Sequence, residues 1–148
     1  MDLQELSDRL EVTDVITRYT RAVDTRRYAD LQVDVFTPDA VLDYSAVGGP
    51  VGPPAEVVPW VEKGLRGFAR YQHLVGQVSI AFAAPGPTGR PDEAEVTAYF
   101  TNPMVSVAPD GSETLWEVGG YYHHTMVRTA DGWRSRRLVD ENVWMRGF

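Results

Sequence analysis

Apolar residues recur with the period of an α-helix over the first 25 residues of the chain. Charged residues fill most of the positions between them, which is typical of a helix that covers a core with one face. The pattern predicts an amphipathic helix from about Leu3 to Thr25. Its expected buried stripe is Leu6, Leu10, Ile16, Tyr19 and Val23.

Shorter elements follow this helix. A second helix is predicted over about residues 28–36, ending before Pro38, and a strand over residues 40–45. The glycine- and proline-rich residues 48–54 predict a loop without regular structure. A third helix is expected over about residues 55–69, and its buried stripe would be Val57, Trp60, Val61, Leu65 and Phe68.

From residue 71 onward the pattern changes to long strands joined by tight turns. The turn sequences Pro-Asp-Gly-Ser and Ala-Asp-Gly are hairpin signals. Four strands are predicted, over residues 71–83, 93–107, 113–129 and 133–144. Helices followed by antiparallel strands indicate a single α+β domain over residues 1–148, in which a curved sheet packs on helices and encloses a pocket.

Composition narrows the possible functions. The chain has 148 residues, a net charge of −7 and no cysteine. The negative charge disfavours nucleic acid and anionic membranes as partners, and the absence of cysteine excludes thiol chemistry and disulfides. No apolar run has the length of a membrane span and the N-terminus is not signal-like, so we expect a cytoplasmic protein.

The candidate chemistry rests on histidine and aspartate. All three histidines, His73, His123 and His124, lie in the strand-rich half, and Asp24 ends the first helix. The chain has no glycine-rich nucleotide loop and no metal-ligand spacing, because adjacent histidines on a strand point to opposite faces. We therefore predict no metal and no cofactor, and we expect proton transfer to and from a small organic molecule.

Four stretches resemble a known family. They are RYTRAVD at 18–24, FTPDA at 36–40, QHLVG at 72–76, and residues 119–133, which end in RTADGW. With the order of elements, they resemble the SnoaL-like branch of the nuclear-transport-factor-2-like superfamily. This branch includes scytalone dehydratase, polyketide cyclases and ketosteroid isomerases. The resemblance covers nearly the whole chain and implies a cone-shaped α+β fold with a pocket.

The resemblance also implies roles for single residues. Asp24 falls where the dehydratase-like enzymes carry a catalytic aspartate, His73 where its histidine partner lies, and Tyr44 where a tyrosine polarises the substrate carbonyl. The second catalytic histidine of the dehydratase has no counterpart on the strand at residues 96–106. We expect His123 to supply an imidazole instead, with the Tyr121 and His123 face of its strand turned toward the pocket.

Further residues are expected to form the core or the pocket wall and to contact the substrate. This set is Tyr19, Trp60, Phe68, Tyr99, Met104, Trp116, Tyr121 and Asp140. For Asp140 an alternative is an ion pair across the sheet with Arg134, Arg136 or Arg137.

The resemblance implies an enzyme without a cofactor that cyclises, isomerises or dehydrates a small hydrophobic, polyketide-like intermediate. Two alternatives stay open. One is epoxide opening by Asp24 with Arg18 or Arg21, and the other is a binding or scaffolding protein that has lost the chemistry. A homodimer through the open sheet face is expected, because the long exposed strands need covering.

Overall fold

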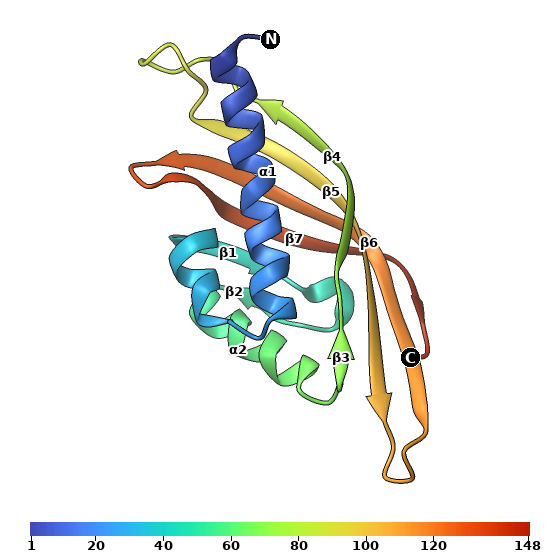
Figure 1. The fold of residues 1–148 in the computed structure, drawn as a ribbon. Helices are drawn as coiled ribbons and strands as arrows, with labels where there is room; N and C mark the ends of the chain where they lie inside the picture. Colours follow the sequence, from blue (N-terminus) through green and yellow to red (C-terminus); the bar gives the residue numbers. More distant parts are fainter.

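A computed structural model describes residues 1–148 and shows one long helix lying across a strongly curved sheet (Figure 1). The α+β layout predicted from the sequence is confirmed. The two α-helices are α1 (Leu3–Asp24) and α2 (Pro54–Leu65). The strands are β1 (Phe36–Asp43), β2 (Val51–Gly52), β3 (Arg70–Tyr71), β4 (Leu74–Phe82), β5 (Glu93–Val107), β6 (Glu113–Thr129) and β7 (Gly132–Arg146).

The sheet has the order β2-β1-β7-β6-β5-β3, and β4 also pairs with β5. All pairs are antiparallel except β1 with β7, which run parallel. The long strands β5, β6 and β7 curve around α1, while α2 lies beside β1 and β2 (Figure 1). Neither helix is long and apolar enough to cross a membrane.

The register between β6 and β7 shifts beside Gly120. A Cβ atom at Gly120 would lie 1.8 Å from the carbonyl oxygen of Glu141, so only glycine allows the two strands to approach so closely there. Such an irregularity bends a sheet, because one strand gains a residue relative to its neighbour. The bend lets the sheet wrap around the end of α1.

Three local elements differ from the sequence prediction. The expected helix over residues 28–36 is a five-residue π-helical turn, Leu31–Val35, and β1 begins directly after it. Within the expected loop, Val51–Gly52 pairs with the end of β1. The strand expected over residues 71–83 is interrupted between β3 and β4, and His73 lies in the interruption.

The buried face of α1 also differs from the expected stripe in its first half. Leu6 and Leu10 are exposed, whereas Asp8 is only 1% exposed. Farther along, Ile16, Tyr19 and Val23 pack on the sheet as expected, and Val12 and Val15, which were not in the expected stripe, are buried with them. In this first part of α1 the Asp8 carboxylate therefore faces the sheet, and the two leucines face outward.

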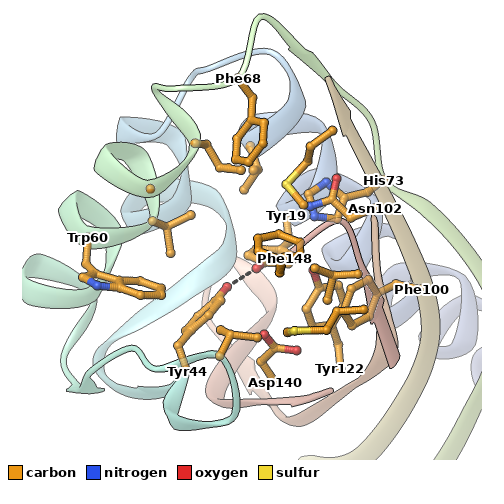
Figure 2. A pocket seen from close by; sticks show the side chains of 18 residues that line it. Tyr19, Tyr44, Trp60, Phe68, His73, Phe100, Asn102, Tyr122, Asp140 and Phe148 are labelled. Carbon is orange, nitrogen blue, oxygen red and sulfur yellow. Dashed lines mark hydrogen bonds between the residues drawn. The ribbon is translucent and has the colours of Figure 1, made fainter. Parts of the chain in front are cut away.

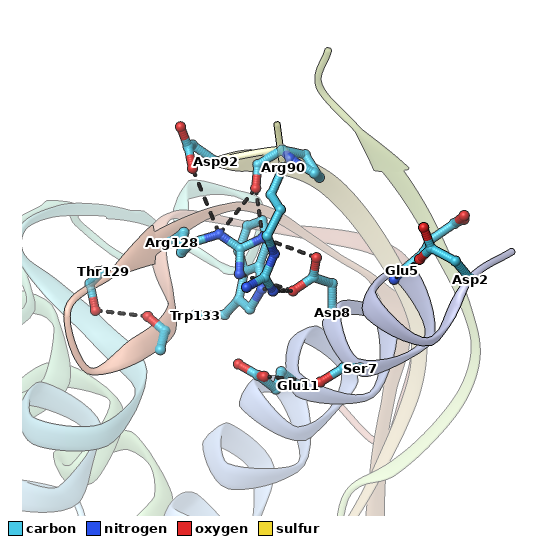
Figure 3. A network of polar contacts seen from close by, with 12 residues as sticks. Asp2, Glu5, Ser7, Asp8, Glu11, Arg90, Asp92, Arg128, Thr129 and Trp133 are labelled. Atoms are coloured by element: carbon cyan, nitrogen blue, oxygen red, sulfur yellow. Dashed lines mark hydrogen bonds and ion pairs between the residues drawn. The ribbon is translucent and has the colours of Figure 1, made fainter. Parts of the chain in front are cut away.

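The buried Asp8 carboxylate is surrounded by donors from the far end of the sheet (Figure 3). Arg90 and Arg128 contact its Oδ1 at 2.6 and 2.9 Å, Arg128 contacts Oδ2 at 3.0 Å, and Trp133 Nε1 donates to Oδ1 at 3.2 Å. Burial alone would raise the pKa of Asp8, but the hydrogen bonds from Arg128, Trp133 and Arg90 outweigh it and lower the pKa to about 2. This network fixes the N-terminal half of α1 on the sheet.

Candidate functional site

A cavity of about 230 Å³ lies between the C-terminal half of α1, α2 and the concave face of the sheet (Figure 2). Most of its wall is apolar, and no arginine or lysine lines it. The polar side chains in the wall are Tyr19, Tyr44, His73, Asn102, Tyr122 and Asp140. Of the residues expected in the substrate set, Tyr19, Trp60, Phe68, Met104 and Asp140 line this cavity, as do Tyr44 and His73.

The structure brings Asp24 and His73 together, although 49 positions separate them in the sequence. The imidazole Nδ1 lies 2.7 Å from Asp24 Oδ1, and the backbone N–H of His73 donates to Oδ2 at 2.9 Å. A carboxylate at the C-terminal end of a helix is disfavoured by the helix dipole. The two donors of His73 compensate for this, because each carboxylate oxygen accepts one hydrogen bond.

Neighbouring contacts hold the end of α1 against the chain that carries His73. Tyr71 of β3 donates its hydroxyl to the carbonyl of Val23 at 3.2 Å and lies 2.7 Å from the hydroxyl of Tyr28. Arg26, in a left-handed backbone conformation, donates to the carbonyl of Phe68 at 2.9 Å. These bonds bracket the histidine and aspartate pair, so its geometry follows from the packing of α1 on β3.

The pairing determines the tautomer assigned to His73. Asp24 accepts the Nδ1 proton, so Nε2 of a neutral imidazole carries the free electron pair. Nε2 forms no hydrogen bond to the protein, and His73 is part of the cavity wall beside the rings of Phe100 and Tyr122. The arrangement places an imidazole nitrogen that has no protein partner in the cavity wall, with a carboxylate hydrogen bonded to the other ring nitrogen.

Two tyrosine hydroxyls meet at the other end of the cavity (Figure 2). Tyr19 of α1 and Tyr44, which follows β1, are hydrogen bonded to each other. Burial raises the pKa of both hydroxyl groups above the usual value for tyrosine, so both stay protonated at neutral pH. One hydroxyl donates to the other, and the second proton remains free for a ligand.

Two further oxygen-bearing side chains are buried without a hydrogen-bond partner at one oxygen. These are Asn102 on β5, whose Oδ1 has none, and Asp140 on β7, whose Oδ1 has none. Desolvation, aided by the charge of Asp43, raises the pKa of Asp140 to about 7. Sequence reasoning missed Asn102, although it shares the inward period-two face of its strand with Phe100 and Met104. The alternative ion pair of Asp140 with an arginine does not form.

Four residues of the expected site lie elsewhere. Tyr99, Tyr121 and His123 lie on the opposite face of the sheet, where the rings of Tyr99 and Tyr121 are 4.7 Å apart. His123 Nε2 lies 2.5 Å from Glu141 Oε2, on that outer face. Trp116 does not line the cavity, because it packs behind Phe68 and donates its Nε1 proton to Ser106 at 2.8 Å.

The expected orientation of this strand was therefore wrong. Side chains alternate along β6, and Tyr122 and His124 face the helices while Tyr121 and His123 face outward. His124 is fully buried, 2.9 Å from Ser135 Oγ. Desolvation, with a smaller contribution from His123, lowers the pKa of His124 to about 3, so it is a neutral core residue.

No three His, Cys, Asp or Glu side chains converge in a geometry that could hold a metal ion. The functional groups that the cavity offers are the imidazole of His73, the carboxyl group of Asp140, the amide of Asn102, the hydroxyl of Tyr122 and the paired hydroxyls of Tyr19 and Tyr44. Together they can accept a proton at one end of a ligand and donate hydrogen bonds elsewhere.

The chain belongs to the SnoaL-like family, whose domain model matches residues 4–139. An uncharacterized protein of Mycobacterium tuberculosis is 36% identical over 146 residues, which cover 99% of this chain and 92% of the relative. The resemblance stated from the motifs is thus confirmed.

Solved structures show the same fold. A candidate scytalone dehydratase from Novosphingobium aromaticivorans matches with a TM-score of 0.81 at 15% identity, over 97% of this chain and 89% of that one. The hexachlorocyclohexane dehydrochlorinase LinA-type3 from Novosphingobium barchaimii matches with a TM-score of 0.77 at 15% identity, over 99% of this chain and 93% of that one.

Proposed function

We propose that the protein is a cofactor-independent acid–base enzyme that removes a proton from a carbon atom of a small hydrophobic, polyketide-like intermediate. The observation that carries this proposal is the pair of His73 and Asp24, 2.7 Å apart, with the imidazole in the wall of a mainly apolar cavity. Cyclisation, isomerisation and dehydration all begin with such a proton transfer. Two structural neighbours are described as a dehydratase and a dehydrochlorinase, names that denote eliminations.

In this mechanism His73 Nε2 takes the proton and Asp24 stabilises the imidazolium that results. Negative charge that develops on a ligand oxygen would be stabilised by the free tyrosine proton of the Tyr19 and Tyr44 pair. The apolar wall excludes water and so strengthens both interactions. The cavity volume of about 230 Å³ is smaller than the roughly 300–1,000 Å³ typical of sites for drug-sized ligands, which favours a compact substrate.

The epoxide-opening alternative loses its structural basis. It required Arg18 or Arg21 beside Asp24, but Arg18 pairs with Asp14 at 3.3 Å and Arg21 is exposed. No arginine lines the cavity. The alternative of a binding protein predicts the same cavity without turnover, so it is distinguished by experiment.

The test is hydrogen–deuterium exchange at carbon, which does not require the natural substrate. Small ketones such as cyclohexanone and 2-indanone are incubated with the protein in D₂O, and loss of the protons next to the carbonyl is followed by NMR. The wild type should accelerate exchange, and His73→Gln should lower the acceleration by about 10²–10⁴-fold. His123→Gln removes an imidazole from the outer face and should leave the rate unchanged.

Exchange in the wild type no faster than in His73→Gln would contradict acid–base catalysis. If the ketones nevertheless bind with equal affinity to both proteins, the result supports a binding protein instead. The exchange rate with Asp24→Asn should lie between those with wild type and His73→Gln. The imidazole remains in this variant, but the carboxylate that holds its tautomer and stabilises its charged form is lost.

We also propose that the open sheet face forms a homodimer. Its surface carries exposed apolar side chains around a shallow hollow lined by Leu74, Tyr99, Tyr121, Val143 and Trp144. A row of such side chains on paired strands is a surface that a second copy can cover. Sedimentation velocity of the wild type and of Tyr99→Glu tests this, since a dimer should dissociate in the variant.

A further inference from the structure

Asp140 lies in the cavity wall without the partners that a charged carboxylate needs. Its side chain is directed inward from β7, opposite Tyr122 of β6, and the residue is only 5% exposed. Its Oδ1 has no hydrogen-bond partner in the protein. A buried polar atom that lacks a partner costs free energy, so its presence in a ligand cavity indicates an atom that a ligand satisfies.

Asp140 forms no ion pair with any cation of the protein, and the nearest arginine on its own strand, Arg137, acts on the charge of Asp43 instead. The neighbouring ionisable groups are Tyr19 of α1, Asp43 and Tyr44 at the end of β1, and Tyr122 of β6. On β7 itself, Arg136 points away and pairs with Glu93 on the outer side at 2.7 Å. The tyrosines are neutral because burial raises their pKa, and the nearby charge of Asp43 is negative.

These surroundings favour the uncharged form of the carboxyl group. Desolvation, assisted by Asp43, raises the pKa of Asp140 to about 7, so a large fraction is protonated at neutral pH. A protonated carboxyl group donates one hydrogen bond and still accepts others. Its natural partner in an apolar cavity is an uncharged oxygen, such as a ketone carbonyl or a hydroxyl.

The same surroundings act against anions. A ligand carboxylate would enter a cavity whose wall contains no arginine or lysine, whose one imidazole, His73, is already paired with the Asp24 carboxylate, and which contains the carboxyl group of Asp140. An anion buried without a counter-charge is strongly disfavoured. The cavity therefore discriminates by charge as well as by size.

We propose that Asp140, as an uncharged carboxylic acid, donates a hydrogen bond to an oxygen of the ligand and makes the cavity selective for uncharged, oxygen-bearing molecules over carboxylates. The inference deepens the proposed function and rests on the cavity being a ligand site. It concerns recognition, whereas the proposed catalysis depends on His73. The two ideas can therefore fail separately.

The experiment uses acetophenone and benzoate, which have nearly the same shape but differ in charge. Binding of each to the wild-type protein is measured by NMR titration at pH 6 and pH 8. Because the neutral fraction of a group with a pKa near 7 falls about tenfold between these values, acetophenone should bind about tenfold more weakly at pH 8. Benzoate should bind at least tenfold more weakly than acetophenone at both values.

The matched variant is Asp140→Asn, which keeps a donor of similar shape but cannot ionise. Acetophenone should bind to it equally at pH 6 and pH 8. His73→Gln should keep the wild-type pH dependence, which separates recognition from the catalytic proposal. A pH dependence that survives Asp140→Asn, or benzoate binding as tight as that of acetophenone, would overturn the proposal.

An infrared measurement checks the charge state without any ligand. The difference spectrum of wild type minus Asp140→Asn at pH 6 should contain the C=O stretch of a carboxylic acid, and this band should fade toward pH 8. If neither probe binds, this band still decides the question, since its absence at pH 6 shows an ionised Asp140 and overturns the proposal.

Discussion

Asp8 and Asp140 are both almost fully buried against the sheet, yet the pKa values of their carboxyl groups move in opposite directions. Asp8 is contacted by two arginines and a tryptophan N–H, and its pKa is lowered to about 2. Asp140 forms no ion pair, one of its oxygens has no partner, and its pKa is raised to about 7. Burial disfavours the charge at both sites, and only at Asp8 do donors outweigh it.

The different hydrogen bonding of Asp8 and Asp140 distinguishes the two ends of α1: the N-terminal end is fixed on the sheet, and the C-terminal end borders the cavity. At the N-terminal half of α1, every oxygen of Asp8 is saturated by groups of the chain itself, which leaves nothing for a ligand to contact. At the C-terminal half, Asn102 and Asp140 each keep a buried oxygen without a protein partner in the cavity wall. Buried atoms without a partner also occur outside the cavity, as at Arg90 Nε and His124 Nε2, so it is their position in the cavity wall that makes those of Asn102 and Asp140 candidates for ligand contact.

The largest expected effect on stability comes from removing the charge of Asp8, whose two carboxylate oxygens both accept hydrogen bonds. Asp8→Asn keeps the shape of the side chain but leaves Arg90 and Arg128 without their buried counter-charge. Removing one partner of a buried ion pair costs about 3–5 kcal/mol, so the free energy of unfolding should fall by that amount. Urea unfolding at pH 7 measures it, and Asp2→Asn at the exposed start of the helix is the control.

The effect of Asp8 should also depend on pH in a defined direction. The folded-state pKa of about 2 lies below the ordinary value of 3.8, so the carboxylate stabilises the fold fully above about pH 4. This stabilisation is lost as the pH falls toward 2. The gap between wild type and Asp8→Asn should therefore narrow in acid, and a constant gap would contradict the ion-pair explanation.

A smaller effect on stability, of opposite sign, is expected for Asp140 in the cavity wall. The folded-state pKa of Asp140, about 7, lies above the ordinary 3.8, so the folded state holds its proton more tightly than the unfolded chain. Wild-type stability should fall as the pH rises from about 4 through 7. Asp140→Asn cannot ionise, and it should be more stable than the wild type by on the order of 2–4 kcal/mol at pH 8, with little difference at pH 4.5.

Urea unfolding of both proteins at pH 4.5, 6 and 8 tests this expectation. A stability difference that is the same at all three values would show that Asp140 does not titrate between them. A gain in stability at the cost of acetophenone binding would show that the chain retains a destabilising group for recognition.

Two of the long strands, β5 and β6, were predicted with the bounds that the structure shows. Residues 93–107 and 113–129 alternate along their length, and Pro109-Asp110-Gly111-Ser112 forms the turn between them. Local pattern suffices here because each strand pairs with its neighbour in the sequence. The pairing of Asp24 with His73, in contrast, was expected only through the family resemblance, since 49 positions separate the two residues.

Alternation predicts that neighbouring residues face opposite sides but not which side is inside. On β6 the outward choice of Tyr122 and His124 was wrong, because both faces of this strand carry a tyrosine and a histidine. Asp8 shows the same limit on a helix. A carboxylate is expected outside unless its partners are known, and these come from residues 90, 128 and 133. Only the tertiary structure brings these partners to Asp8, so the local sequence pattern does not reveal them.

A further prediction concerns Trp133, one of the hydrogen-bond donors to Asp8. Trp133→Phe keeps a large aromatic ring against Arg128, whose guanidinium lies 4.6 Å from the ring, but removes the Nε1 donor to Asp8. Loss of a hydrogen bond to a charged group costs about 1.5–3 kcal/mol, which is less than the loss of Asp8 itself. In the Asp8→Asn background the same substitution should cost less, and full additivity in urea unfolding would contradict a shared network.

The smallest effect is expected at His123, the histidine that sequence reasoning placed in the site. His123 and His124 are neighbours, but His123 pairs with Glu141 on the outer face while His124 is sealed in the core. A hydrogen bond between side chains on the outer face contributes less than about 1 kcal/mol, so His123→Gln should leave both unfolding and acetophenone binding nearly unchanged. His124→Gln should destabilise the protein more, because it disturbs a fully buried side chain that contacts Ser135. If His123→Gln instead weakened acetophenone binding, the outer face would take part in recognition, and the division between a saturated framework and an unsaturated cavity would fail.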